Sequence, residues 1–180
     1  MVCQLDKVEF AAFVREQQEP LRRFLLNLSG GDGALADDIA QDAFIKAYTG
    51  LSSFHGGSKL STWLFRIAYN CFYDQMSKRM RLSEVQLPTD RKIDGADRAS
   101  DPMVVQSAGP DRITVNNDIN KALKNLAENE KAVLLLFYME EKKISDIAVI
   151  TGMKENTVKS HLSRGREHLK VYLKQAGYGE

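Results

Sequence analysis

Apolar residues recur at intervals of three and four along most of this 180-residue chain, and that period predicts helices. The first helical pattern carries Phe10, Phe13 and Val14, and a similar pattern follows from Leu21 to Leu28. Pro20 stands between the two patterns and predicts either the opening of a second helix or a kink, because proline fits poorly in a helix interior. No stretch sustains the period of two that is typical of strands, so the predicted fold class is all-α.

Two further patterns complete the first half of the chain. A helix from Leu35 to Ala47 is expected between a glycine-rich turn at residues 30–33 and Gly50. A loop broken by glycines, followed by one long helix, is expected between Phe54 and Arg81. The inward stripe of this long helix is predicted from helical spacing to be Trp63, Leu64, Ile67, Ala68 and Cys71.

The other faces of the long helix mix aromatic, polar and basic residues: Arg66, Tyr69, Asn70, Phe72, Tyr73, Lys78, Arg79 and Arg81. On a solvent-exposed face this mixture suits single-stranded nucleic acid, because bases stack on rings while cations follow the phosphates. The alternative is an amphipathic core helix with ordinary aromatics and a solvated basic end. This stretch alone leaves both interpretations open.

Residues 83–116 interrupt the helical pattern. Pro88, Pro102 and Pro110 punctuate a stretch rich in Asp, Ser, Gly and Arg, in which apolar residues are sparse and aperiodic. A flexible linker is predicted here, because structureless loops of this length are uncommon inside one compact domain. The chain is therefore expected to form two small helical domains, residues 1–82 and 117–180, joined by this linker.

The second domain ends in a pattern typical of a helix-turn-helix. Helical periodicity marks residues 119–126 and 133–139, and a short helix from Ile144 to Thr151 precedes Gly152 and a longer helix from about Glu155 to Lys174. The outward face of the last helix is predicted to hold Lys159, Ser160, Ser163 and Arg164, with His161, Arg166 and Lys170 beside them.

This outward face has the chemistry of a DNA-reading surface. Early residues of a recognition helix reach base edges in the major groove, where Lys and Arg donate to guanine and Ser bonds either type of edge. The flanking cations suit phosphates. The alternative is a structural helical hairpin with a solvated basic face.

Composition narrows the classes of function. The chain is 43% hydrophobic and 27% charged with a net charge of +1, which indicates a soluble protein with local basic patches. Cys3 and Cys71 form no disulfide framework, the apolar runs are too short for a membrane span and no signal pattern is present, so a cytoplasmic protein is expected. No nucleophile–base set, phosphate loop or ligand spacing among the histidines predicts an enzyme, a metal site or a cofactor.

Asp37, Asp38 and Asp42 form an acidic group near the start of the helix from Leu35 to Ala47. The helix dipole favours carboxylates at this end, so a solvated acidic face is one interpretation. The other is a protein-docking face, in which Asp38 and Gln41 are directed toward a basic partner.

Three motifs together resemble a bacterial RNA polymerase sigma factor of the extracytoplasmic-function class. They are ADDIAQDAFIKAY (Ala36 to Tyr48), LSSFHGGSKLSTWLFRIAYN (Leu51 to Asn70) and TVKSHLSRGREHL (Thr157 to Leu169). The first two are specific in combination, whereas LuxR-type regulators carry a helix similar to the third. A stand-alone regulator of LuxR type is therefore the competing interpretation, although it would have no use for a single-strand platform between Phe54 and Asn70.

The resemblance implies a non-catalytic subunit that joins core RNA polymerase and gives it promoter specificity. Docking on core polymerase would be carried by Asp38, Gln41, Asp42 and Phe44. An unstacked base of the melting element would be captured by Phe54 and Asn70, with phosphate contacts expected from Arg66, Lys78, Arg79 and Arg81. The upstream element would be read by Lys159, Ser160, His161, Ser163, Arg164 and Arg166.

The implied partners are core RNA polymerase, promoter DNA in duplex and single-stranded form, and an anti-sigma factor, often membrane-bound. Two positions depart from the family pattern. Lys154 stands where the family often has a Ser cap, and Gly165 stands where it usually has Ala, although glycine costs about 1 kcal/mol in a helix interior. The alternative for the expected melting site is that the Phe54 side chain fills space in the core and that Asn70 is an ordinary helix residue.

Overall fold

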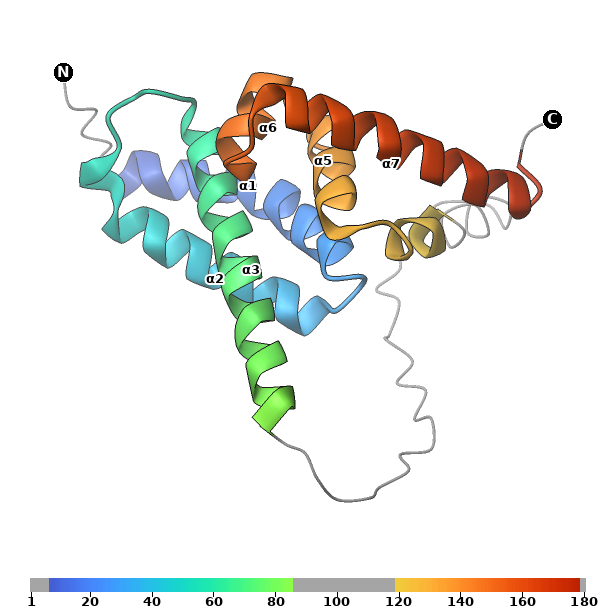
Figure 1. The fold of residues 1–180 in the computed structure, drawn as a ribbon. Helices are drawn as coiled ribbons and strands as arrows, with labels where there is room; N and C mark the ends of the chain where they lie inside the picture. Colours follow the sequence, from blue (N-terminus) through green and yellow to red (C-terminus); the bar gives the residue numbers. More distant parts are fainter. Residues whose placement is uncertain (1–6, 86–118, 179–180) are drawn as a thin grey trace, which may run out of the picture.

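The computed structural model describes residues 7–85 and 119–178, and the regular structure in these two ranges is helical (Figure 1). The predicted all-α class is confirmed. The predicted linker, residues 83–116, lies outside the described residues except for its first three, which continue a helix.

The first half consists of three long helices that pack against one another. They are α1 (Lys7–Leu28), α2 (Gly33–Thr49) and α3 (Leu60–Val85), with a short 3-10 turn at Leu51–Ser53 between the last two. The buried apolar residues of α2 are those with helical spacing, as predicted, and Gly50 ends that helix. The single long helix predicted after the glycine-broken loop is also confirmed.

The prediction of a separate helix opening at Pro20 is wrong, because α1 runs through this residue. A proline inside a helix removes one backbone hydrogen bond and costs about 3 kcal/mol. Leu21, Phe24 and Leu25, which follow it directly, are fully buried. Burial of such side chains contributes about 1.5–3 kcal/mol each, so the core offsets the cost of an uninterrupted helix.

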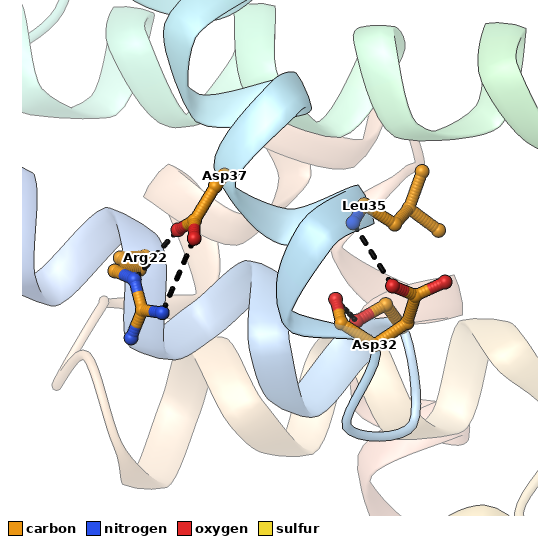
Figure 2. Close-up of polar contacts among 5 residues, drawn as sticks. Arg22, Asp32, Leu35 and Asp37 are labelled. Atoms are coloured by element: carbon orange, nitrogen blue, oxygen red, sulfur yellow. Dashed lines mark hydrogen bonds and ion pairs between the residues drawn. The ribbon is translucent and has the colours of Figure 1, made fainter. Parts of the chain in front are cut away.

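Two polar contacts fix the start of α2 (Figure 2). The carboxylate of Asp32 accepts a hydrogen bond from the Leu35 N–H at 2.9 Å and caps the helix. Arg22 on α1 holds Asp37 with two bonds, Nε–Oδ1 at 2.6 Å and Nη2–Oδ2 at 3.3 Å. This ion pair raises the pKa of Arg22 and ties α2 to α1, so the outward side of α2 has a defined orientation.

The second half follows the predicted order of helices. A helical segment at residues 119–124 precedes α5 (Glu128–Tyr138), α6 (Ile144–Thr151) and α7 (Glu155–Gln175). Gly152 ends α6 with a φ of 72°, a left-handed conformation that glycine adopts without strain. The helix-turn-helix formed by α6 and α7 is therefore confirmed.

Gly165 is explained by the close approach of α7 to α5. A Cβ atom at this position would lie 2.8 Å from Leu134 Cδ1 and 3.3 Å from Glu130 Cβ. Both neighbours are buried, and the Glu130 carboxylate is held by His168 Nδ1 at 2.8 Å. The departure from the family pattern therefore has a packing reason, since a Cβ at this position would force Leu134 and Glu130 to shift.

The two halves pack against each other, which the sequence did not predict. In Figure 1, α6 lies beside the first turns of α3, and α5 packs against α1. One continuous cluster of buried apolar side chains runs through both halves. The position of the helix-turn-helix in this structure is therefore set by contacts with α1 and α3.

Gly165→Ala should lower stability although alanine is the better helix former. Overpacking costs about 1–3 kcal/mol and alanine returns about 1 kcal/mol of helix propensity, so a net loss of up to about 2 kcal/mol is expected. Urea unfolding followed by circular dichroism measures it. Gly57→Ala is the control, because its Cβ would meet no atom within 4 Å; equal stability of both variants would contradict the packing explanation.

Candidate nucleic-acid interface

The outward face of α2 is acidic at one end and apolar at the other. Asp38, Gln41 and Asp42 are exposed, as the docking hypothesis requires. Ile45 and Tyr48 follow at helical spacing and are 55% and 47% exposed, so they extend this face. We name these five residues the α2 face.

Phe44 lies on a different side of α2 from these residues. It is half-buried and packs against the core, so its ring supports the helix from behind. Ile45 is the apolar residue that faces outward, and the sequence analysis missed it. Helical spacing from Asp38 and Asp42 could have identified it, because positions i+3, i+4 and i+7 share one face.

The loop before α3 holds Phe54 in a packed position. The ring is 8% exposed, and its centroid lies 5.3 Å from that of Trp63. Gly56, two residues on, has a φ of 74°, and residues 55–57 are exposed, so the loop itself is accessible. In this conformation the Phe54 ring is not available to an extruded base, and its stacking role stays a prediction.

Arg66 and Asn70 are exposed one turn apart on α3, so they share a face of this helix. The aromatic residues predicted to accompany them are placed differently. Tyr69 and Phe72 are buried, and Tyr73 is half-buried. Of the two interpretations left open for these rings, burial of Tyr69 and Phe72 favours the amphipathic core helix with a solvated basic end, because the helix is covered on more than one side.

The basic end of α3 is exposed at Lys78, Arg79 and Arg81. Arg79 Nη1 lies 3.4 Å from Asp32 Oδ2, the carboxylate that caps α2. Both side chains are about half exposed, so this pair is weak. The pair therefore does little to fix the position of the Arg79 guanidinium.

The residues predicted to form the DNA-reading face of α7 lie on its exposed side. Lys159, Ser160, Ser163 and Arg164 are exposed, whereas the inward row of Val158, Leu162 and Gly165 is buried. The Ser160 hydroxyl donates to the Asn156 carbonyl at 2.9 Å, which leaves its lone pairs as acceptors. α7 begins at Glu155 as predicted, although Lys154 supplies no capping bond from its side chain.

Of the three residues predicted to flank this face, Lys170 is exposed, whereas His161 and Arg166 also have other surroundings. His161 is half-buried, and its Nδ1 is enclosed without a hydrogen-bond partner. The Arg166 guanidinium lies 5.5 Å from the ring centroids of both Phe137 and Tyr138. Arg166 is therefore held by cation–π contact, which adds a packing role to its predicted phosphate contact.

Other kinds of site were sought in the same ranges. Within residues 7–85 and 119–178, no three His, Cys, Asp or Glu side chains are grouped so that they could hold a metal ion. The described helices also include none that combines the length and the apolar character needed to cross a membrane.

Comparison with known families matches both halves of the chain. Residues 13–82 match the family model described as Sigma-70 region 2, and residues 116–169 match that described as Sigma-70, region 4. The first match contains the α2 face and the loop and helix from Phe54 to Asn70. The second contains the helix-turn-helix.

Individual relatives agree with these matches. "ECF RNA polymerase sigma factor SigW" of Bacillus subtilis is 32% identical over 145 residues, which cover 77% of this chain and 75% of the relative. "RNA polymerase sigma-H factor" of Pseudomonas aeruginosa is 30% identical over 169 residues, covering 90% and 84%.

Solved structures match across both halves. The sigma factor RpoE from Bartonella quintana, in complex with the anti-sigma factor NepR, has a TM-score of 0.72 and 30% identity, covering 92% of this chain and 97% of that one. CnrH, in complex with the cytosolic domain of CnrY, has a TM-score of 0.65, covers 94% and 90%, and at 19% identity shares the fold.

Arg164→Ala and Arg166→Ala should affect DNA binding differently. Loss of a bidentate guanine contact by Arg164 should cost about 1–3 kcal/mol on a preferred duplex and leave random duplex unaffected. Arg166→Ala should weaken both duplexes alike, flatten the salt dependence and lower thermal stability, because it also loses its ring contacts. Fluorescence anisotropy and thermal melting measure these effects, with Glu167→Ala as an exposed control on the same helix. Equal losses on both duplexes for both variants would contradict the division of roles.

Proposed function

Because this chain belongs to the extracytoplasmic-function (ECF) class of RNA polymerase sigma factors, we propose that three of its surfaces divide the work of transcription initiation. As a member of this family it binds core RNA polymerase and directs it to specific promoters. The observation that carries the division is that both family regions are present, each with an exposed polar face on a regular helix. The boundaries of the two functional units are residues 1–82 and 117–180.

The α2 face docks on core polymerase. Its carboxylates at Asp38 and Asp42 attract a basic partner surface and steer the encounter. The exposed Ile45 side chain supplies the apolar contact that stable protein interfaces bury at their centre. The Arg22–Asp37 pair and the packing of Phe44 hold this face in place from behind.

The outer face of α7 reads the upstream promoter element in duplex form. Lys159, Ser160, Ser163 and Arg164 approach base edges, and His161 and Arg166 lie at the margin of the contact. The buried row on the opposite side anchors the helix to α5 and α6.

The exposed side of α3 and the loop before it bind the melting element as a single strand. Asn70 offers donors and an acceptor to an unstacked base, and Arg66, Lys78, Arg79 and Arg81 track the phosphates. Unstacking a base costs a few kcal/mol, and stacking on a ring returns about 1–3 kcal/mol. Phe54 provides that ring when the accessible loop moves it away from Trp63.

The proposed partners and setting follow from the family. The matched structure of RpoE contains the anti-sigma factor NepR, and that of CnrH contains the cytosolic domain of CnrY. We propose that an anti-sigma factor, which in this family is often membrane-bound, also controls this chain. The chain acts in the cytoplasm as a non-catalytic initiation factor, and no cofactor is needed for these binding roles.

Docking predicts a charge-dependent contact. The double variant Asp38→Lys with Asp42→Lys should weaken binding to purified core polymerase by at least tenfold, because two attractive contacts become repulsive. Thermal stability should change little, since both side chains are exposed. Fluorescence anisotropy with labelled protein measures binding. Asp74→Lys, an exposed charge reversal on α3, is the control. Unchanged affinity of the double variant for core polymerase would contradict the docking assignment.

Strand opening predicts a separate phenotype. Asn70→Ala should leave formation of the closed complex nearly intact and should impair transcription from duplex templates more than from templates with a pre-opened bubble. Phe54→Leu should do the same, because leucine fills the buried site at a cost below about 1.5 kcal/mol but cannot stack on a base. Permanganate footprinting reports the bubble directly. Wild-type reactivity in Phe54→Leu would assign this ring to packing alone, and wild-type reactivity in both variants would refute the site.

A further inference from the structure

The four residues proposed to approach base edges differ in what they offer a base. Lys159 and Arg164 carry only donors, so they pair with acceptors such as guanine O6 and N7. The hydrogen of the Ser160 hydroxyl is donated to the Asn156 carbonyl at 2.9 Å, so the Ser160 oxygen acts as an acceptor. The hydroxyl of Ser163 can donate or accept. These four side chains therefore hold few acceptors for the amino groups by which adenine and cytosine are distinguished in the major groove.

Asn156 adds the chemistry that this set lacks. It is exposed and lies one helical turn before Ser160, so the two side chains share a face of α7. α7 begins at Glu155, and residues at the start of a recognition helix are the ones that reach base edges. Among residues 7–85 and 119–178, none forms a hydrogen bond with the side-chain amide of Asn156. Its oxygen and its two N–H groups are therefore available to a ligand.

Neither packing nor helix formation requires an asparagine at this position. The side chain is exposed, and Lys154 rather than Asn156 stands at the cap of the helix. Asparagine is also among the weaker helix formers once it lies inside a helix. The amide of Asn156 is thus exposed on the helix face that carries the other proposed reading residues, and the fold makes no use of it.

The planar amide of asparagine matches the edge of adenine. In the major groove adenine presents N7 as an acceptor and its N6 amino group as a donor, so one amide can donate to the first and accept from the second. Guanine has O6 in place of the amino group, and the amide oxygen would then face another oxygen.

Ser160 extends the same chemistry along the groove. It follows Asn156 by about 6 Å along the helix axis, which corresponds to about two base pairs of DNA with a rise of about 3.4 Å. Because its hydrogen is held by the Asn156 carbonyl, its oxygen accepts from the amino group of adenine or cytosine.

We propose that Asn156 is a further specificity-determining residue of α7, which selects adenine in the upstream promoter element, and that Ser160 accepts from the amino group of a nearby base. The inference rests on the proposed reading role of α7 and adds the identity of the base. α7 thereby reads guanine with its cations and adenine with its amide.

The test uses the full-length chain assembled with purified core polymerase. Preferred duplexes are selected from a library with a randomised upstream segment and are then sequenced. The wild-type element should contain an adenine that Asn156→Ala no longer selects, whereas Ser160→Ala should relax the preference at a different position. The affinity of Asn156→Ala for the selected duplex should fall roughly tenfold, as expected for the loss of a bidentate base contact.

Base analogues identify the atoms involved. At the selected position, 7-deazaadenine lacks the N7 acceptor and unsubstituted purine lacks the N6 amino group. Each should weaken binding of the wild-type chain roughly fivefold, because each removes one hydrogen bond, and neither should affect Asn156→Ala. Asn156→Asp should change the preferred base at this position from adenine to cytosine, because a carboxylate only accepts and cytosine presents its N4 amino group.

A matched control comes from the other end of the same helix. Gln175→Ala also removes an exposed side-chain amide from α7, and it should select the wild-type element with wild-type affinity. Circular dichroism checks that every variant keeps its helices.

The possible outcomes separate this inference from the proposed function. An element in which no position responds to Asn156→Ala or Asn156→Asp would overturn the inference and leave the reading role of α7 standing. Equal weakening by Asn156→Ala on every duplex would also overturn it, because the amide would then contact the DNA backbone. If the wild-type complex selects no upstream element, the proposed reading role itself fails, and the inference fails with it.

Discussion

The burial of α3 on two sides is the constraint on which the rest of the structure depends. The Phe65 ring contacts Phe24 of α1 on one side, with centroids 5.5 Å apart, and the Lys142 ammonium of the second half on another. Because α3 is enclosed in this way, α1 and α2 pack around it, and α6 of the helix-turn-helix packs against its first turns. Within the enclosed part of α3, Arg66 and Asn70 are exposed and so remain accessible to a ligand.

Local periodicity was sufficient for most of the fold. The order of helices, the stops at Gly50 and Gly152 and the inward row of α7 depend on residues a few positions apart, so sequence spacing reports them. Pro20 misled the prediction because the cost of a proline is local, whereas the burial that offsets it comes from the whole core. The packing of the halves depends on pairs such as Arg23 and Glu140, which no local pattern can connect.

The candidate sites divide in the same way. The polar outer rows of α2 and α7 were predictable, because exposure follows directly from the inward stripe on the opposite side. The exposure of Tyr69 and Phe72 was left open, because periodicity within one helix does not show that Asn129 of the second half lies against Tyr69. Phe44 was preferred over Ile45 through motif resemblance, although helical spacing alone directs Ile45 outward. Motif resemblance identified the family, and geometry assigns the individual side chains.

The separation of inner and outer rows on α7 has a consequence for evolution and engineering. The inner row of Val158, Leu162 and Gly165 holds the helix in place, and a Cβ at Gly165 would lie only 2.8 Å from Leu134 Cδ1. The outer row is exposed, so substitutions there typically change stability by less than about 0.5 kcal/mol. Under the reading role proposed for this row, duplicated copies of such a gene can diverge in their target promoters without an intermediate that fails to fold, and regulators with new targets can be built by exchanging the outer row alone.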